Sequence, residues 1–194
     1  MHLSKDLERY YTVGNCDTLI KKMKMIMISE TFWYLVFFRI GSFFKNEFRI
    51  PVIKQILYIL FWVIHKILSI IIGIQIPLGT KINQGLYLPH YGLIVVHQKA
   101  KIGMHCNIGQ GVTIGIAGRK EKKGVPEIGN YVYIAPGAKI IGKIKIGNNV
   151  MIGANAVVTK DVPDNSVVAG IPARIISNKG WDVNGNPYQN VKED

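Results

Sequence analysis

The chain has 194 residues, 48% of them hydrophobic and 19% charged, which suits one large folded domain or two small ones and excludes a disordered protein. The formal net charge of +12 indicates an anionic partner, either nucleic acid, an anionic membrane surface or a polyanionic small molecule. Nucleic acid is disfavoured, because the basic run carries no interleaved aromatics and no nucleic-acid-binding motif is recognised. A basic chain that needs no anionic partner is the remaining alternative.

The two cysteines, Cys16 and Cys106, form neither a metal-type pair nor a disulfide framework, which suits a reducing compartment. The charged and polar start of the chain does not resemble a secretory signal. We therefore expect the protein in the cytoplasm or at the inner face of the cell membrane.

The first part of the chain predicts three helices, over residues 17–29, 30–44 and 52–73. Asp17 is expected to cap the first of them, because its carboxylate can accept from the exposed amides of the opening turn.

The third helix is the most apolar segment, but its longest uninterrupted apolar run covers only residues 56–64 before His65 and Lys66 break it. That run is too short to cross a bilayer. Two alternatives stay open: a buried helix that caps the second half of the chain, or a helix in a membrane interface. In the second case anionic head groups would meet the basic residues Arg39, Lys45, Arg49, Lys54 and Lys66.

A period of six residues governs the second half of the chain. Aliphatic residues recur at this spacing in three series: Ile76, Ile82 and Leu88; Val96, Ile102, Ile108 and Ile114; Ile128, Ile134, Ile140, Ile146, Ile152 and Val158. Each hexad is predicted to form a short strand and a tight turn with the aliphatic side chain inside, and three hexads complete one coil of a solenoid. The Gly or Ala that often follows is expected to leave room at the corners and to permit unusual backbone angles.

A solenoid must be capped at both ends. The preceding helices can cap one end, and the segment 164–176 with the tail after it can cap the other. The chain is therefore divided into a helical region (1–74), a β-helix (75–176) and a C-terminal tail (177–194).

The repeat breaks twice, at residues 89–92 and within the polar segment 115–126. Breaks in a rigid stack are suitable places for binding and chemistry. His90 lies in the first break and is a candidate general base, because histidine takes up a proton near neutral pH. Gln110 is expected one coil away from it. A turn histidine without a catalytic role is the alternative reading.

His97 and His105 are the other histidines in this half, and three histidines raise the alternative of a zinc site. Metal binding is disfavoured because no carboxylate or thiol joins them at ligand spacing, and because His105 occupies an outward-facing position of the repeat.

Four segments in this order, 85–103, 107–115, 134–163 and 165–176, resemble the serine acetyltransferase branch of the hexapeptide-repeat acyltransferases. Within the branch the chain looks most like the exopolysaccharide (colanic-acid and capsular type) O-acetyltransferases. The resemblance covers about residues 75–176. It implies a left-handed parallel β-helix, a homotrimer with active sites between subunits, acetyl-CoA as cosubstrate and no metal.

The same resemblance assigns site residues. His90 matches the family's catalytic histidine, which removes the proton of the acceptor hydroxyl before this attacks the thioester. The groove for coenzyme A matches Gly115, Ile116, Ala117, Pro136, Ala154, Ala173 and Arg174.

Three departures from the family pattern bear on the acceptor. Pro89 and Gln75 stand where the serine acetyltransferases have aspartates, and Val125 stands where they have a second histidine. Gln75 can orient the His90 imidazole as a supporting residue but cannot stabilise imidazolium with a full charge.

The groups that bind the charged ends of an amino acid are therefore expected to be missing. We expect a sugar hydroxyl as acceptor, on a small molecule or a lipid-linked unit, in capsular or exopolysaccharide biosynthesis. The alternatives are serine O-acetylation for cysteine biosynthesis and a catalytically inactive trimeric scaffold at the membrane.

Overall fold

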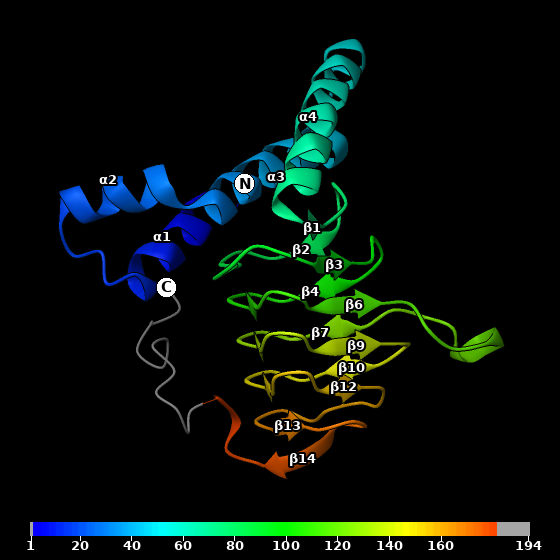
Figure 1. Ribbon diagram of the computed structural model, residues 1–194. Coiled ribbons are helices and arrows are strands. Elements are labelled where there is room, and N and C mark those ends of the chain that lie inside the picture. The colour runs from blue at the N-terminus through cyan, green and yellow to red at the C-terminus, as the bar shows by residue number, and fades with distance from the viewer. Residues whose placement is uncertain (1, 182–194) are drawn as a thin grey trace.

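The computed structural model describes residues 2–181 of the chain. Four helices come first, and their bounds are α1 (Leu3–Val13), α2 (Leu19–Ile28), α3 (Glu30–Asn46) and α4 (Pro51–Ile72). A column of short strands follows, as Figure 1 shows, with the helices gathered at one end of the column. The expected fold class, a left-handed parallel β-helix with an α-helical N-terminal region, is confirmed.

The strands form the three faces of the β-helix. One face holds β1 (Ile74–Gln75), β3 (Ile94–Val96), β6 (Thr113–Gly115), β9 (Lys139–Ile141) and β12 (Val157–Val158), in that order. A second face runs in the order β10 (Lys145–Ile146), β7 (Glu127–Ile128), β4 (Lys101–Ile102) and β2 (Lys81–Ile82). The third face holds β14 (Arg174–Ser177), β13 (Val167–Ala169), β11 (Met151–Ile152), β8 (Tyr133–Ile134) and β5 (Asn107–Ile108). Every strand pair is parallel except β13–β14, whose antiparallel pairing ends the column.

The hexad register is confirmed by burial. All thirteen aliphatic residues of the three series are at most 5% exposed, and the partner strands align them one above another, as Ile102 with Ile128. The residues four positions later, such as Val112 and Val150, are buried as well. Two inward-facing residues per hexad therefore fill the interior of each coil. A single coil cannot bury them, so the core forms only when several coils stack.

Glycine follows the aliphatic residue because neighbouring backbones come close there. A Cβ built on Gly103 would lie 2.4 Å from the carbonyl oxygen of Gly129, which no side chain can tolerate. The expectation of unusual backbone angles at these positions is wrong, since Gly103 does not have positive φ. Left-handed angles occur instead at turn residues such as Asn149 and Asn155, where asparagine accepts this conformation well.

The helix that covers the end of the β-helix is α3. Its buried side chains Tyr34, Leu35 and Phe38 join the same core cluster as the first coils, and the Tyr34 hydroxyl receives a hydrogen bond from the backbone N–H of Ile76 at 3.1 Å. Capping by the N-terminal helices, as the sequence predicts, is thus made in part by the middle of α3, together with contacts from α1 and α4.

A buried ion pair joins two helices to the coil. The Arg39 guanidinium lies 2.7 Å from the Asp6 carboxylate, and both side chains are at most 6% exposed. Arg39 also donates to the carbonyl oxygens of Ile82 and Asn83, and Asp6 accepts from the backbone N–H of Leu86 at 3.0 Å. Both charges are therefore paired and hydrogen-bonded, which is the condition for burying them.

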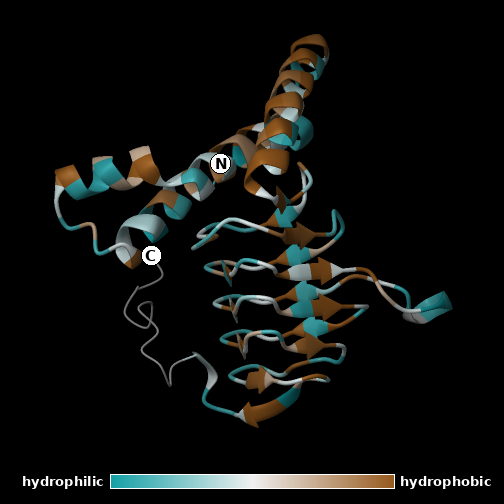
Figure 2. Cartoon of the chain, in the orientation of Figure 1, coloured by the Kyte–Doolittle hydropathy of each residue, from teal (hydrophilic) through white to brown (hydrophobic). Residues whose placement is uncertain are grey.

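Most of α4 packs poorly against the rest of the chain. Only 11% of its most apolar 18-residue window is buried, although the mean hydropathy there is 2.0, and by length and composition the helix could cross a membrane. One face packs on α3, and a second face is apolar and open, as the colouring of Figure 2 indicates. We call this open face the α4 stripe, and it comprises Val52, Ile53, Ile56, Ile59, Leu60, Val63, Ile67, Ile70 and Ile71. The alternative of α4 as a buried core helix is therefore wrong.

Two further expectations for the helices need correction. The helix α1 was not predicted, although it supplies Asp6 and Arg9 to the core. The cap of α2 is Thr18, whose hydroxyl accepts from the backbone N–H of Lys21, and not Asp17. Asp17 instead pairs with the Lys21 ammonium at 2.7 Å on the surface.

The division of the chain into domains stays a prediction. The helices end at Ile72 and the first strand begins at Ile74, close to the expected boundary. The predicted C-terminal tail lies mostly outside the described residues, since these end at 181.

Candidate functional site

His90 lies in an exposed turn between two buried residues of the β-helix, Leu88 and Ile94. The turn is made by two left-handed residues, Gly92 at φ 102° and Leu93 at φ 54°. These angles place the two extra residues outside the coil, so that the hexad register resumes at β3 without a shift. The first break in the repeat therefore presents a histidine on a rigid support.

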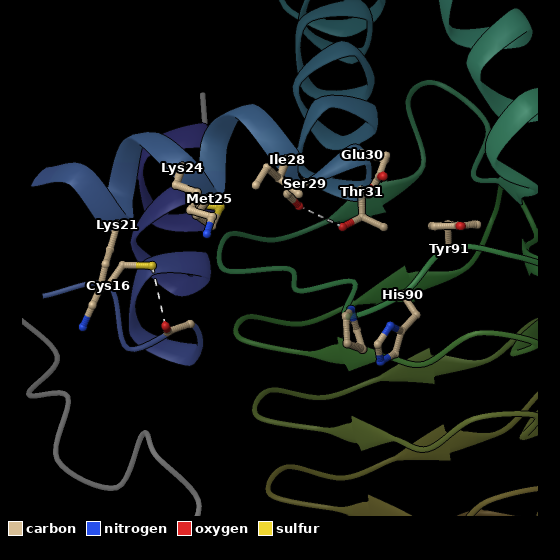
Figure 3. Close-up of a pocket in the computed structure, with 12 residues that line it drawn as sticks. Cys16, Lys21, Lys24, Met25, Ile28, Ser29, Glu30, Thr31, His90 and Tyr91 are labelled. Atoms are coloured by element: carbon tan, nitrogen blue, oxygen red, sulfur yellow. Dashed lines mark hydrogen bonds between the residues drawn. The ribbon is translucent and has the colours of Figure 1, made fainter. Parts of the chain in front are cut away.

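A cavity of about 460 Å³ opens beside this turn, between the β-helix and the helices α2 and α3 (Figure 3). Its lining residues are Gly14, Cys16, Lys21, Lys24, Met25, Ile28, Ser29, Glu30, Thr31, Pro89, His90 and Tyr91. Figure 3 shows His90 and Tyr91 on the β-helix side of the cavity, with Ser29, Glu30 and Thr31 facing them from the start of α3. A volume of this order accommodates a small metabolite.

The cavity carries charges of both signs from residues that sequence reasoning did not select. Lys24 and Glu30 both line it, and neither has an ion-pair partner among residues 2–181. Lys21 also lines it but is engaged with Asp17. No sequence signal could have singled out Lys24 and Glu30, because they are separated from His90 by some sixty residues and lie in helices without a repeat.

The two residues expected to support His90 are placed differently. Gln110 lies in the neighbouring coil, since the backbone N–H of Gly111 donates to the carbonyl oxygen of Gly92 at 2.9 Å. Its side-chain Oε1 is buried without a hydrogen-bond partner within the described part of the chain, and Gln110 does not line the cavity. Gln75 lies on β1 and lines a different cavity, so the structure does not bring it into the cavity of His90. Both supporting roles stay predictions.

The residues predicted to hold coenzyme A flank the face that contains β6, β9 and β12. Gly115 ends β6 and opens the polar loop, in which Ala117 and Gly124 form a two-way backbone bridge at 3.1 and 3.0 Å. Pro136 and Ala154 lie at the opposite edge, in the turns that precede β9 and β12. The remaining members are the exposed Ile116, and Ala173 and Arg174 at the start of β14.

These positions form two groups at opposite edges of one face. His90 precedes β3 and Gly115 ends β6, and the two strands run parallel with Val95 opposite Thr113. A strand of three residues spans about 10 Å, so the polar loop and His90 are separated by at least that length within one chain. Within one chain the predicted site is therefore divided between the two edges of this face.

The other two histidines have local partners. The His97 Nδ1 accepts from the backbone N–H of Lys99 at 3.1 Å, and the His105 ring stacks on Tyr131 with 5.3 Å between centroids. Burial, and then the nearby Arg9, lower the pKa of His105. Within residues 2–181 no group of three or more His, Cys, Asp or Glu side chains is arranged to hold a metal ion.

Comparisons with known proteins show which proteins this chain is similar to. Residues 126–160 match the family described as bacterial transferase hexapeptide (six repeats). The chain is 34% identical to the serine acetyltransferase of Synechococcus elongatus over 81% of its own length and 62% of that protein. It is 44% identical to a serine acetyltransferase of Staphylococcus aureus over 60% of its length and 55% of the relative. The chain thus spans less than two thirds of these curated relatives.

Solved structures give the same result. The crystal structure of serine acetyltransferase in complex with coenzyme A from Brucella abortus matches with a TM-score of 0.76 and 29% identity, over 92% of this chain and 68% of the other. The Neisseria gonorrhoeae serine acetyltransferase in complex with serine matches with a TM-score of 0.71 and 25% identity, over 90% of this chain and 67% of the other.

These relatives contradict the expected sugar acceptor. The relatives and solved structures named above are serine acetyltransferases, and none of these supports an assignment to polysaccharide biosynthesis. The sugar acceptor was expected because Gln75, Pro89 and Val125 leave the β-helix without charged groups for an amino acid. The helices supply charges to the cavity from outside that pattern. The repeat, the coil and these relatives together make the β-helix of this chain similar to the bacterial hexapeptide transferases, and to serine acetyltransferases among them.

Proposed function

We propose that the protein transfers the acetyl group of acetyl-CoA to the hydroxyl of serine. The observation that carries the proposal is the cavity that His90, Lys24 and Glu30 line together. Similarity to serine acetyltransferases, including one solved with coenzyme A and one solved with serine, supports both substrates.

Serine carries a carboxylate and an ammonium group at neutral pH, and a site for it needs a charge of each sign. Lys24 supplies a cation for the carboxylate, and Glu30 supplies an anion for the ammonium. Because neither has a competing ion-pair partner within the described chain, binding serine costs no existing pair.

The proposed chemistry follows from a histidine at the edge of such a cavity. The His90 imidazole takes the proton of the serine hydroxyl while the oxygen attacks the carbonyl carbon of the thioester. The tetrahedral intermediate collapses with cleavage of the carbon–sulfur bond. The leaving thiolate then takes the proton back from the imidazolium, so His90 ends the cycle neutral. Backbone N–H groups of the turn would stabilise the oxyanion.

The cosubstrate is proposed to approach from the polar loop. Gly115, Ile116 and Ala117 lie across one face from His90, so we infer that the loop of a neighbouring subunit reaches the His90 cavity in a homotrimer. Basic residues of the loop, such as Lys120 and Lys123, suit the phosphates of coenzyme A. Light scattering tests the trimer: a monomer at assay concentrations would overturn this arrangement.

The reaction is tested by measuring the release of free thiol from acetyl-CoA by the purified protein in the presence of serine. We expect serine-dependent release that falls by about 100-fold or more in His90→Ala, in line with the usual contribution of a general base. His97→Ala is the matched control and should retain full activity, because His97 lies outside the cavity. Absence of release together with absence of acetyl-CoA binding would overturn the proposal and favour an inactive scaffold.

The acceptor is tested by the charges of the cavity. Glu30→Gln and Lys24→Ala should each raise the KM for serine while leaving the KM for acetyl-CoA unchanged, because each removes one ionic contact to the amino acid. Lys22→Ala on the same helix is the control, since Lys22 does not line the cavity. An unchanged KM for serine in both variants would show that these charges do not bind it.

A further inference from the structure

The α4 stripe is an extended surface that the proposed reaction does not use. Its nine side chains are between 41% and 74% exposed, and residues spaced three, four and seven apart bring them to one face of the helix. No charged residue interrupts the stripe. A contiguous apolar face of this length, in a chain that otherwise buries its aliphatic residues at every hexad, indicates a surface that is covered in use.

The border of the stripe is basic and aromatic. Trp62 and Lys66 follow one edge of it, and they also line a second cavity of about 340 Å³ at the base of the helix, to which α3 contributes Lys45. The whole of α4 contains neither Asp nor Glu. Trp62 is 48% exposed, and tryptophan beside lysine at the edge of an apolar face is typical of a membrane interface.

The positive charge beside the stripe distinguishes between two partners that could cover it, a second copy of the chain and a lipid surface. A second copy of the chain placed on the stripe would bring one lysine border against another with no acidic residue on α4 to pair with them. An anionic lipid surface offers apolar chains to the stripe and negative head groups to the exposed Lys66. The formal charge of +12 adds long-range attraction to such a surface.

The other face of α4 is in contact with the rest of the chain. His65 and Ser69 are buried there, and the aromatic rings of Tyr34 and His65 lie 4.9 Å apart. A helix that lies in the interface keeps these contacts and buries only the stripe.

We propose that the α4 stripe docks the protein on an anionic lipid bilayer, with α4 lying in the interface and with Lys66 holding a lipid head group. A second apolar face lies at the same end of the molecule on α2, where Leu19, Ile20 and Met27 are each more than 70% exposed next to the lysines of that helix (Figure 1). The proposal does not depend on the identity of the acceptor.

The test is sedimentation of the full chain with vesicles of phosphatidylcholine, with or without phosphatidylglycerol. We expect binding to the anionic vesicles and weaker binding to the neutral ones. The double variant Ile56→Glu/Ile67→Glu should bind at least about tenfold more weakly, because two charged side chains would enter the apolar layer. Ile176→Glu is the matched control: Ile176 is 67% exposed, similar to Ile56 at 62%, but lies at the opposite end of the β-helix.

The charge contribution is separated by Lys66→Ala, which should weaken binding to anionic vesicles by about fivefold and leave binding to neutral vesicles unchanged. The substituted residues are exposed, so an unchanged melting temperature should confirm that each variant is folded. Failure of the wild-type protein to bind, or equal binding by the double variant, would overturn the proposal. A change of oligomeric mass in the double variant without a change in vesicle binding would show that a second copy covers the stripe instead. None of these outcomes depends on acetyl transfer.

Discussion

The β-helix and the helical region obtain their stability in different ways. In the β-helix each coil repeats one set of contacts, in which an aliphatic residue of one hexad stacks on its counterpart in the next coil. In the helical region a few specific long-range contacts, such as Arg39 with Asp6, fix the helices, and one face of α4 stays open. A repeated contact is visible in the sequence as a period, whereas a single contact between distant residues is not.

The largest effect on stability is expected at the buried ion pair that joins the helical region to the β-helix. Asp6→Ala should lower the free energy of unfolding by about 3–5 kcal/mol, because it leaves the Arg39 charge buried without its partner. Urea unfolding measures the change. Asp17→Ala is the control, since its pair with Lys21 is exposed, and the midpoint should stay where it is. A small effect of Asp6→Ala would mean that the cap does not depend on this one junction.

A pair of identical substitutions compares the two regions directly. Ile134→Ala removes a fully buried hexad side chain and should cost about 2–5 kcal/mol of unfolding free energy. Ile70→Ala on the α4 stripe changes a side chain that is 72% exposed, and in the absence of lipid should change stability by no more than about 0.5 kcal/mol. Thermal melting measures both changes. Equal losses of unfolding free energy in the two variants would contradict the difference between the regions and would indicate that another surface covers the stripe in solution.

Because every coil repeats the same contacts, the sequence predicted the β-helix almost completely. Every aliphatic position of the hexads is buried as expected, and both breaks are loops outside the coil. The period even places Gln110 beside the turn of His90, since a coil has constant length. The period does not show why residue 103 must be glycine. A larger side chain there would collide with the backbone of Gly129, and only the stacking of the coils brings that backbone close.

The candidate site was predictable only in its β-helix half. His90 could be found because a break in a strict repeat is conspicuous. Lys24 and Glu30 could not, because their place in the cavity depends on how α2 and α3 fold back over the coil. The same limit explains why α1 was missed and why the environment of α4 was left open: helical periodicity shows that a face is apolar but not what covers it.

The pH dependence of stability probes a group at the contact of α4 with α3. Burial lowers the pKa of His65 to about 4, against an ordinary value of 6.5. The unfolded chain takes up a proton below 6.5 while the folded protein stays neutral there. The stability contributed by neutral His65 is therefore complete above pH 6.5 and is lost as the pH falls towards 4, by about 3 kcal/mol in all.

His65→Leu should remove this part of the pH dependence, so that unfolding free energies measured between pH 7 and pH 4 fall less steeply than in the wild type. His97→Leu is the matched control, because His97 lies at the surface of the β-helix and should leave the slope unchanged. An equal slope in His65→Leu and the wild type would show that the junction admits the charged imidazole.

The smallest effect is expected on the outer surface of the β-helix, where Lys101 and Glu127 pair across adjacent strands at 2.6 Å with about half of each side chain exposed. The hydrogen bond from Lys101 lowers the pKa of the Glu127 carboxyl, so the pair forms at neutral pH. Glu127→Gln should nevertheless cost less than about 1 kcal/mol, and high salt should reduce the difference further, because water screens an exposed pair. Urea unfolding at low and high salt measures both. A loss as large as that of Ile134→Ala would mean that cross-strand charges, and not the interior ladders, hold the coils together.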